Sequence, residues 1–260
     1  MINNSYQQEV ACAIHPDVNS FNLVMEAFLQ LNDPARVEDL LLEMDATNGA
    51  VSPNSESFSK VIRAWTQNEM NNPAYGLPGS SCENAWKWLD ELLQREKKDR
   101  PDLGPAPELF SSILKTAAMT DATSENLLSV GQRTFWAMRE SRFGVDSFAY
   151  AWLLEIGLKV LQSPKHNERR ETFVASLAKQ CCKDGLLSVR FIRQLADGKV
   201  YAEGWTAEES ERLGRKVFGE AEFPVVWSRN LQKGQRQPRV QDMVRARTST
   251  ENWLKKNNYE

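Results

Sequence analysis

The sequence predicts an all-α fold, specifically an α-solenoid of stacked antiparallel helical hairpins. Its 13 glycines and 11 prolines among 260 residues fall below the roughly 12% of average usage, which argues against a turn-rich β-sandwich. Four segments repeat one helical pattern, and a second amphipathic segment follows the first three. Because a single hairpin buries its apolar face poorly, neighbouring hairpins are expected to stack. An irregular all-α bundle with coincidental amphipathic helices is the alternative.

The first helices are predicted from four segments that begin near Pro16, Pro53, Pro105 and Val145. They align on an aromatic residue, which is Phe21, Phe58, Phe110 or Tyr150. The third residue after it is Val24, Val61, Ile113 or Leu153, and the seventh is Phe28, Trp65, Ala117 or Gly157. Residues at this spacing lie on one face of a helix, so we expect each segment to bury that face.

The second helices are predicted from apolar positions that also align between repeats. These positions hold Val37, Leu40, Leu41 and Met44, then Ala85, Trp88, Leu89 and Leu92, then Gly131, Thr134, Phe135 and Met138. Pro34 and the pair Ser80-Ser81 stand where an N1 proline and N-cap residues open a helix. The extra residues in the longer repeats, Gln67 to Ser80 and Arg95 to Pro107, are predicted to be surface loops.

Four regions follow from these patterns. Residues 1–15 are an N-terminal extension or the remnant of a preceding repeat, and residues 16–160 hold about four repeats. Residues 161–227 are predicted to form a helical region that caps the stack, with helices at Leu187–Ala196 and Thr206–Phe218, the latter opened by a capping box of Thr206 and Glu209. Residues 228–260 are predicted to be a basic, flexible tail.

Charge is unevenly distributed along the chain. Residues 224–260 contain eight Lys/Arg and three Asp/Glu, so residues 1–223 have a net charge of −8. The basic tail is a candidate for partner docking or phosphate binding through Arg229, Lys233, Arg236, Arg239, Arg245 and Arg247. The longest apolar stretch, Phe148 to Leu161, contains two charged residues and is shorter than the roughly 20 residues of a membrane span, so no membrane insertion is predicted.

The segments Pro16 to Asn22 and Leu40 to Met44 resemble the pentatricopeptide repeat, and Pro53 to Trp65 is nearly as similar. The third repeat departs by an insertion and by Ala106, and the fourth has Val145 in place of the proline. Cys181 to Leu187 and Pro224 to Leu231 loosely resemble the segment that follows the repeats in algal members. The resemblance implies an organelle RNA-binding protein of plastids or mitochondria, although Met1 to Val10 shows no transit peptide. Tetratricopeptide repeats, which bind proteins, are the closest alternative.

The residue after each buried aromatic is rotated about 100° from it, toward the concave face of a hairpin array. These positions hold Asn22, Ser59, Ser111 and Ala151, and the first three are candidates for hydrogen bonding to a base. By resemblance each pairs with the last residue of its repeat: Asn22 with Asn54, Ser59 with Ala106, and Ser111 with Asp146. The resemblance implies that the first pair prefers a pyrimidine and the third a guanine, whereas the second discriminates little.

Four residues further along each first helix stand Glu26, Arg63, Lys115 and Glu155. Arg63 and Lys115 are candidates for neutralising phosphates, whereas Glu26 and Glu155 would oppose RNA binding. Among the tryptophans, Trp65, Trp88 and Trp152 are predicted to pack in the core. Trp227 and Trp253, near the basic tail, remain candidates for base stacking.

Catalytic and metal-binding patterns are weak. The chain has two histidines, and His166-Asn167-Glu168 matches the HxE of zinc deaminases without the accompanying PCxxC. It has neither a phosphate-binding glycine loop nor a CxxC pair. We therefore predict no enzyme activity, cofactor or metal, and expect a single-stranded RNA-binding adaptor in organelle RNA processing, stabilisation or translation. The alternative is a helical-repeat scaffold that binds proteins, or a subunit of a larger complex, without direct RNA readout.

Overall fold

The computed structural model describes residues 16–186 and 191, apart from 48–49, 72–78 and 99. These residues form eight α-helices and two short 3-10 helices, and no β-strand occurs among them, which confirms the all-α class for this part of the chain. The elements in order are α1 (Val18–Gln30), α2 (Pro34–Ala46), α3 (Ser55–Asn71), α4 (Ser80–Lys98), η1 (Pro101–Leu103), α5 (Pro107–Met119), α6 (Glu125–Glu140), α7 (Ser147–Val160), η2 (Pro164–His166) and α8 (Asn167–Lys183).

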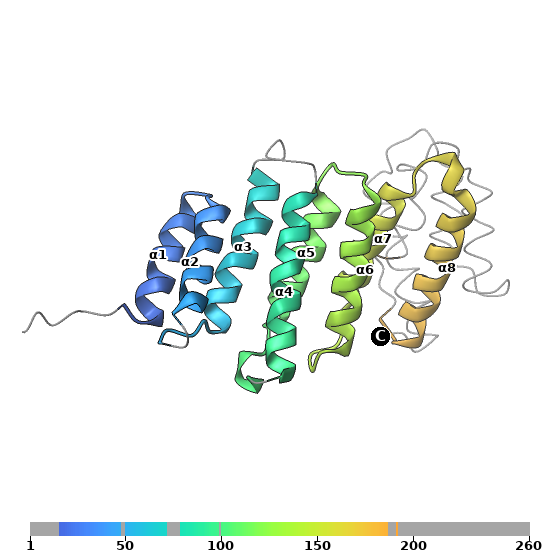
Figure 1. Ribbon diagram of the computed structural model, residues 1–260. Coiled ribbons are helices and arrows are strands. Elements are labelled where there is room, and N and C mark those ends of the chain that lie inside the picture. Colours follow the sequence, from blue (N-terminus) through green and yellow to red (C-terminus); the bar gives the residue numbers. More distant parts are fainter. Residues whose placement is uncertain (1–15, 48–49, 72–78, 99, 187–190, 192–260) are drawn as a thin grey trace, which may run out of the picture.

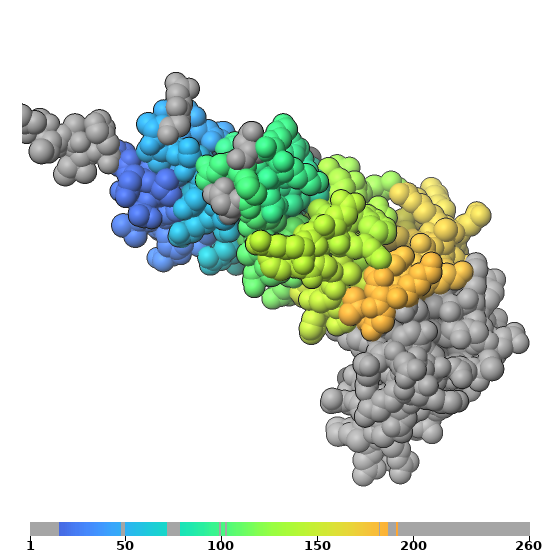
Figure 2. Space-filling view, turned by 90° about the horizontal axis from the view of Figure 1, so that it is seen from below, coloured from blue at the N-terminus to red at the C-terminus, as the bar shows by residue number. Residues whose placement is uncertain are grey.

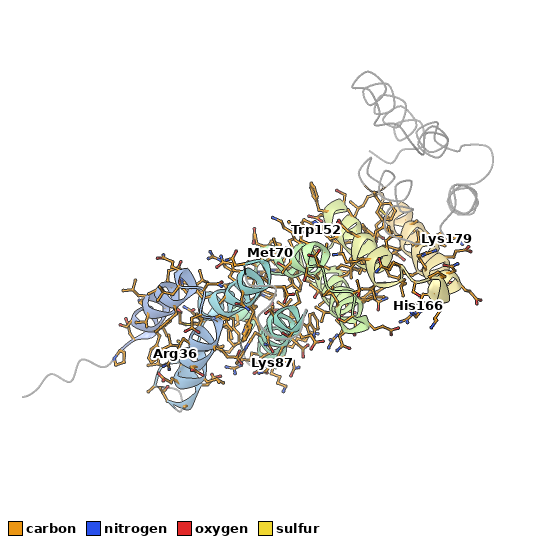
Figure 3. All side chains as sticks on the ribbon, turned by 90° about the horizontal axis from the view of Figure 1, so that it is seen from above. Arg36, Met70, Lys87, Trp152, His166 and Lys179 are labelled. Carbon is orange, nitrogen blue, oxygen red and sulfur yellow. The ribbon has the colours of Figure 1, made fainter. Side chains whose placement is uncertain are left out.

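The helices follow one another across an elongated body, with α1 and α8 at opposite ends (Figures 1 and 2). Each odd-numbered helix contacts the even-numbered helix after it, and each of α1, α3 and α5 also contacts the next odd-numbered helix. Met70 on α3 and Trp152 on α7 lie on one side of the body, and Arg36 on α2 and Lys87 on α4 lie on the opposite side (Figure 3). Helices α3 and α7 therefore present a different face to solvent from α2 and α4.

The helix starts agree closely with the sequence pattern. Helices α1, α3, α5 and α7 each begin two residues after the starts predicted from sequence. Asp17 caps α1 by accepting a hydrogen bond from the main-chain N of Ser20 at 2.8 Å, and Asp146 caps α7 in the same way. Such caps satisfy main-chain N–H groups that have no partner within the helix. Pro34 occupies the first turn of α2, as predicted.

The second helices bury the faces that the sequence predicted. Ten of the aligned apolar positions in α2, α4 and α6 are less than 5% exposed, among them Leu41, Leu89 and Phe135. Gly131 is also buried, whereas Leu40 is only partly buried. The helical period of the pattern therefore identified the inner faces of these helices, as amphipathic packing requires.

Helix α1 departs from the prediction. Val24, which was expected on the buried face, is 45% exposed, and Phe28 is partly exposed. The residues that α1 buries are Asn22, Met25 and Leu29. The cause is the position of α1 in the row: α3, α5 and α7 are each contacted by the even-numbered helix before them, and no described helix occupies that place against α1. The face that is covered on later helices is therefore uncovered here.

Two expected loops are partly helical. Helix α3 continues to Asn71, and α4 continues to Lys98, so the beginnings of both insertions extend existing helices. Among the described residues, no helix is long and apolar enough to cross a membrane.

The last described pair is joined closely. Gly157 of α7 lies against the ring of Phe173 of α8, and a methyl group added at Gly157 would lie 2.0 Å from Cε1 of that ring. After α8, Gly185 has a φ of +67°, and the main-chain N of Leu186 donates to the carbonyl of Cys181 at 3.0 Å. This left-handed residue ends the helix in a Schellman-like turn. The two capping helices predicted after it lie outside the described residues, except for Phe191, which packs against Tyr150.

Candidate functional site

Two neighbouring helices, α3 and α5, each carry a serine followed four residues later by a cation. Ser59 and Arg63 lie one turn apart on α3, and Ser111 and Lys115 lie one turn apart on α5, which contacts α3. Both serines are partly exposed, and both cations are exposed. The hydroxyl of Ser59 donates to the carbonyl of Ser55 at 2.8 Å, so its free lone pairs can still accept a hydrogen bond. We call these four residues the serine–cation strip.

The strip lies on the side opposite Arg36 and Lys87. Met70 is seven residues after Arg63, which is close to two helical turns, so both side chains lie on the same face of α3. Figure 3 shows Met70 on the side of the body away from Arg36 and Lys87. Arg63 therefore lies on that side of α3, and the equivalent residues Ser111 and Lys115 are partly exposed and exposed, respectively, on the neighbouring helix α5.

Asn22 does not open onto this surface. It is 3% exposed, and its carbonyl oxygen accepts a hydrogen bond from the hydroxyl of Ser57 at 2.8 Å. Its amide donates to Oδ1 of Asn54, the residue paired with it in the sequence analysis, at 3.3 Å. The two residues are thus brought together, but their polar groups bond to each other and to Ser57. The expectation that Asn22 faces an open groove is wrong, because α1 is turned so that Asn22 points toward α3.

Glu26 is neutralised within the structure. Nζ of Lys60 on α3 lies 2.7 Å from Oε2 of Glu26 and 3.2 Å from Oε1 of Glu56. The hydrogen bond from Lys60 holds the pKa of Glu26 below its ordinary value, so the carboxylate stays ionised in the pair. Sequence reasoning missed Lys60 because it considered only the first, third, fifth and seventh residues after each aromatic, and Lys60 is the second residue after Phe58. In the structure Lys60 is 8% exposed, a burial that a lysine rarely has without a partner.

The fourth repeat does not continue the strip. Ala151 is completely buried, and Asp146 is exposed but uses Oδ1 to cap α7, accepting from the main-chain N of Ala149 at 2.7 Å. Glu155 is partly exposed and raises the pKa of Lys159, although burial has the larger effect and lowers that pKa overall. Of the predicted polar and cationic positions, those that remain exposed or partly exposed without such a role therefore lie on α3 and α5.

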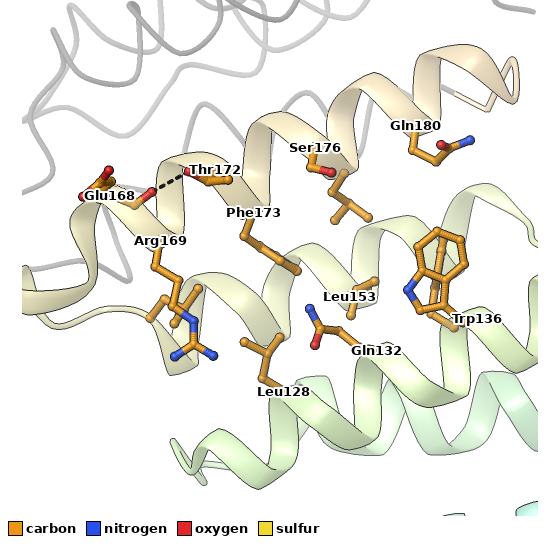
Figure 4. Close-up of a pocket in the computed structure, with 13 residues that line it drawn as sticks. Leu128, Gln132, Trp136, Leu153, Glu168, Arg169, Thr172, Phe173, Ser176 and Gln180 are labelled. Atoms are coloured by element: carbon orange, nitrogen blue, oxygen red, sulfur yellow. Dashed lines mark hydrogen bonds between the residues drawn. The ribbon is translucent and has the colours of Figure 1, made fainter.

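A second surface feature, which the sequence analysis did not identify, is a slot of mixed lining between α6 and α8, with Glu168 and Arg169 among its residues (Figure 4). Its volume is about 590 Å³. Phe135, Leu153 and Leu161 lie at its buried floor, and Gln132, Ser176 and Gln180 contribute polar groups. We call it the α6–α8 slot. No sequence signal identifies it, because it depends on how far two helices from different pairs stand apart.

Several sequence-based candidates lie outside the described residues. They are the six arginines and lysines of the basic tail, Trp227 and Trp253. Trp65 and Trp88 are buried as predicted, whereas Trp152 is partly exposed. His166 ends η2 and Glu168 lies in the first turn of α8. Within the described part of the chain, no group of three His, Cys, Asp or Glu side chains is placed to hold a metal ion.

Comparison with known proteins adds no family assignment. No protein-family model matches the chain, and no curated protein matches it.

Proposed function

We propose that this protein binds single-stranded RNA along the odd-numbered helices, as an adaptor in organelle RNA processing, stabilisation or translation. The proposal takes the helix pairs as pentatricopeptide-like repeats of an α-solenoid, in keeping with their sequence resemblance. The observation that carries it is the serine–cation strip, in which α3 and α5 each place a hydroxyl and an exposed cation one turn apart on adjoining helices.

The strip suits a nucleic-acid chain because it repeats at the spacing of the helices. Neighbouring packed helices are about 8–10 Å apart, so each repeat can serve one nucleotide in an RNA that runs across them. The hydroxyl of Ser59 can accept a hydrogen bond from a base edge, and that of Ser111 can donate or accept one. Arg63 and Lys115 can neutralise two phosphates, which for single strands gives a salt-dependence slope of about −1.4.

The local charge is more favourable than the net charge of residues 1–223 indicates. In the first repeat, Glu26 takes the place that Arg63 and Lys115 occupy in the second and third repeats. Its carboxylate is bonded to Lys60. An ion pair repels phosphate less than a free carboxylate does. Lys60 also pairs with Glu56, so the cluster of Lys60, Glu26 and Glu56 has a net charge of −1, one less negative charge than the two carboxylates alone would carry.

Fluorescence anisotropy with short labelled single-stranded RNAs of mixed sequence tests this proposal. The double variant Arg63→Gln/Lys115→Gln is expected to bind RNA at least about tenfold more weakly at low salt. Its affinity should also lose nearly all of the salt dependence that the two phosphate contacts contribute. The matched control is Arg36→Gln/Lys87→Gln, which removes two exposed cations from the opposite face. Equal weakening by both variants, or no RNA binding by the wild-type protein at low salt, would contradict the proposal. The latter result would favour the protein-binding scaffold.

A further inference from the structure

Helix α7 carries two aromatic side chains on its partly exposed face. Phe148 is 50% exposed, and Trp152, which lies one turn later, packs against the core but is partly exposed. Their ring centroids are 5.9 Å apart, and the ring planes are inclined by 33° to each other. Aromatic rings at this separation are in contact, so each ring restricts the motion of the other. We call this pair the α7 aromatic platform.

The platform lies on the same side of the body as Arg63 of the serine–cation strip. Figure 3 shows Trp152 on the side where Met70 of α3 lies, and Arg63 shares that face of α3. Helix α5, which carries Ser111 and Lys115, contacts both α3 and α7. The platform is therefore the next feature after the strip in the row of helices α3, α5 and α7.

The aligned positions of these three helices differ in chemistry. Two residues before the repeat aromatic, α3 and α5 have the exposed carboxylates of Glu56 and Glu108, whereas α7 has Phe148. At the strip positions α7 has the buried Ala151 and the partly exposed Glu155. Helix α7 thus lacks the hydroxyl and the cation of its neighbours, and it presents aromatic surface where they present an acidic side chain.

We infer that the α7 aromatic platform stacks an unpaired base of the single-stranded RNA that the strip binds, an inference that rests on the proposed function. Packed helices are about 8–10 Å apart, so the nucleotide next to the one at Ser111 reaches α7. Every base has a π face, and stacking on an aromatic side chain adds affinity without reading sequence. Stacking needs no cation, which suits a helix that has Glu155 where α3 and α5 have Arg63 and Lys115.

The size and the surroundings of the platform favour a base over a protein partner. Two rings, one of them packed against the core, form a smaller apolar area than the several hundred Å² typical of protein-binding patches. At the corresponding level the neighbouring helix α5 exposes Glu108 and Lys115, so the surroundings on that side are polar. A base has a flat apolar face and polar edges, which match an aromatic pair beside polar side chains. Because the rings already restrict each other, stacking costs little side-chain entropy.

Fluorescence anisotropy of the full chain, with the labelled RNAs that test the strip, tests this inference. The platform variant is Phe148→Ala/Trp152→Leu, in which leucine keeps apolar contact with the core but has no π face. Its matched control is Phe143→Ala/Trp136→Leu, which makes the same two changes at exposed aromatic residues that line the groove between α4 and α6. The rescue variant is Phe148→Tyr/Trp152→Phe, which keeps both rings. A ribose-phosphate oligomer of the same length without bases serves as the competing ligand.

The platform variant is expected to bind RNA about tenfold more weakly than the wild-type protein, because one stacked base is lost. Its salt dependence should be unchanged, since no phosphate contact is removed, whereas Arg63→Gln/Lys115→Gln lowers that dependence. The matched control and the rescue variant are expected to bind RNA within about twofold of the wild-type protein. The oligomer without bases is expected to bind the wild-type protein and the platform variant equally.

The outcomes separate this inference from the proposed function. If the strip variant weakens RNA binding but the platform variant binds like its control, the inference is overturned and the proposed function stands. A loss that the rescue variant shares, or an equal loss for the oligomer without bases, also overturns the inference because the loss would not come from stacking. If the wild-type protein binds no RNA at low salt, both fail. If circular dichroism shows that the platform variant is unfolded, Phe148→Ala alone, at a half-exposed site, decides, with an expected loss of about threefold.

Discussion

Nζ of Lys60 on α3 lies 2.7 Å from Oε2 of Glu26 on α1, and this bond links the first two helix pairs. It also determines the charge at one end of the serine–cation strip. The same ammonium group lies 3.2 Å from Glu56, so one buried cation serves two carboxylates. The strip therefore depends on a residue that does not itself face the proposed RNA.

The variant Lys60→Gln tests that dependence. Loss of the cation leaves Glu26 and Glu56 uncompensated, so RNA affinity in the anisotropy assay is expected to fall about three- to tenfold at low salt, by unscreened repulsion. The double variant Lys60→Gln/Glu26→Gln is expected to recover most of the loss. Lys87→Gln, which breaks an ion pair with Glu38 on the opposite face, is the control. An unchanged affinity for a folded Lys60→Gln protein would show that Glu26 does not influence RNA binding.

Asn22 is expected to contribute to stability. Replacing it by alanine removes two hydrogen bonds inside the structure, one to Asn54 and one from Ser57, and the hydroxyl of Ser57 then has only Oδ1 of Asn54 as an acceptor, at 3.0 Å. The free energy of unfolding, measured by urea denaturation, is expected to fall by about 1–3 kcal/mol. Asn19→Ala, at an exposed site on the same helix, is expected to cost less than about 0.5 kcal/mol. If Asn22→Ala kept full stability but altered the base preference of bound RNA, Asn22 would contact RNA directly.

Asp184 gives the described C-terminal end an acid-sensitive contact. Burial alone would raise its pKa, but hydrogen bonds from Tyr150, Arg139 and Gln180 together hold the pKa below its ordinary value. Arg139 binds both carboxylate oxygens, at 2.7 and 2.9 Å. Asp184→Asn is therefore expected to lower the free energy of unfolding by about 2 kcal/mol at neutral pH.

The pH dependence of this effect follows from the direction of the shift. The unfolded-state pKa is about 3.9 and the folded-state pKa is lower, so stabilisation is complete well above pH 4 and is lost as pH falls through the folded-state value. The stability difference between the wild-type protein and Asp184→Asn should thus shrink in acid. Asp146→Asn, at an N-cap where asparagine is an equally good residue, should change little at either pH. If the difference in free energy of unfolding between the wild-type protein and Asp184→Asn were the same at about pH 2 as at neutral pH, the stabilisation would come from packing and not from the ionised carboxylate.

Gly157 is required by the close approach of α8. Alanine normally stabilises a helix interior by about 1 kcal/mol relative to glycine, but here its methyl group would overlap the ring of Phe173. Gly157→Ala is expected to lower the free energy of unfolding by about 1–3 kcal/mol. At Gly131 the nearest atom is Cδ1 of Ile156, the movable end of a side chain, so Gly131→Ala should be close to neutral. Urea denaturation of both variants checks this, and equal effects would contradict the explanation.

The sequence predicts where the helices of this fold begin better than it predicts how each helix is oriented against its neighbours. The positions of α1, α3, α5 and α7 follow from the helical period. The structure adds Asp17 and Asp146, which the sequence analysis did not identify as the N-caps of α1 and α7. The buried faces of α4 and α6 also follow, because they have neighbours on both sides. The orientation of α1 does not follow, because the exposure of Val24 depends on the absence of a described helix beside it.

In the candidate site, too, features set by helical spacing can be predicted from sequence, whereas features set by tertiary contacts cannot. The register of Ser59 with Arg63, and of Ser111 with Lys115, is a property of helical spacing and can be predicted from sequence. The ion pair between Lys60 and Glu26 joins residues 34 positions apart, and no local pattern specifies it. The α6–α8 slot likewise depends on the distance between helices of different pairs. Tertiary contacts therefore decide which of the predicted polar residues face solvent.

Photo-crosslinking followed by peptide mapping tests the central claim most directly. The full chain is irradiated with 4-thiouridine-substituted single-stranded RNA, and the crosslinked peptides are identified by mass spectrometry. The serine–cation strip predicts crosslinks in the α3 and α5 peptides that contain Ser59 to Arg63 and Ser111 to Lys115. Crosslinks confined to α2 and α4, or to residues 228–260, would contradict it.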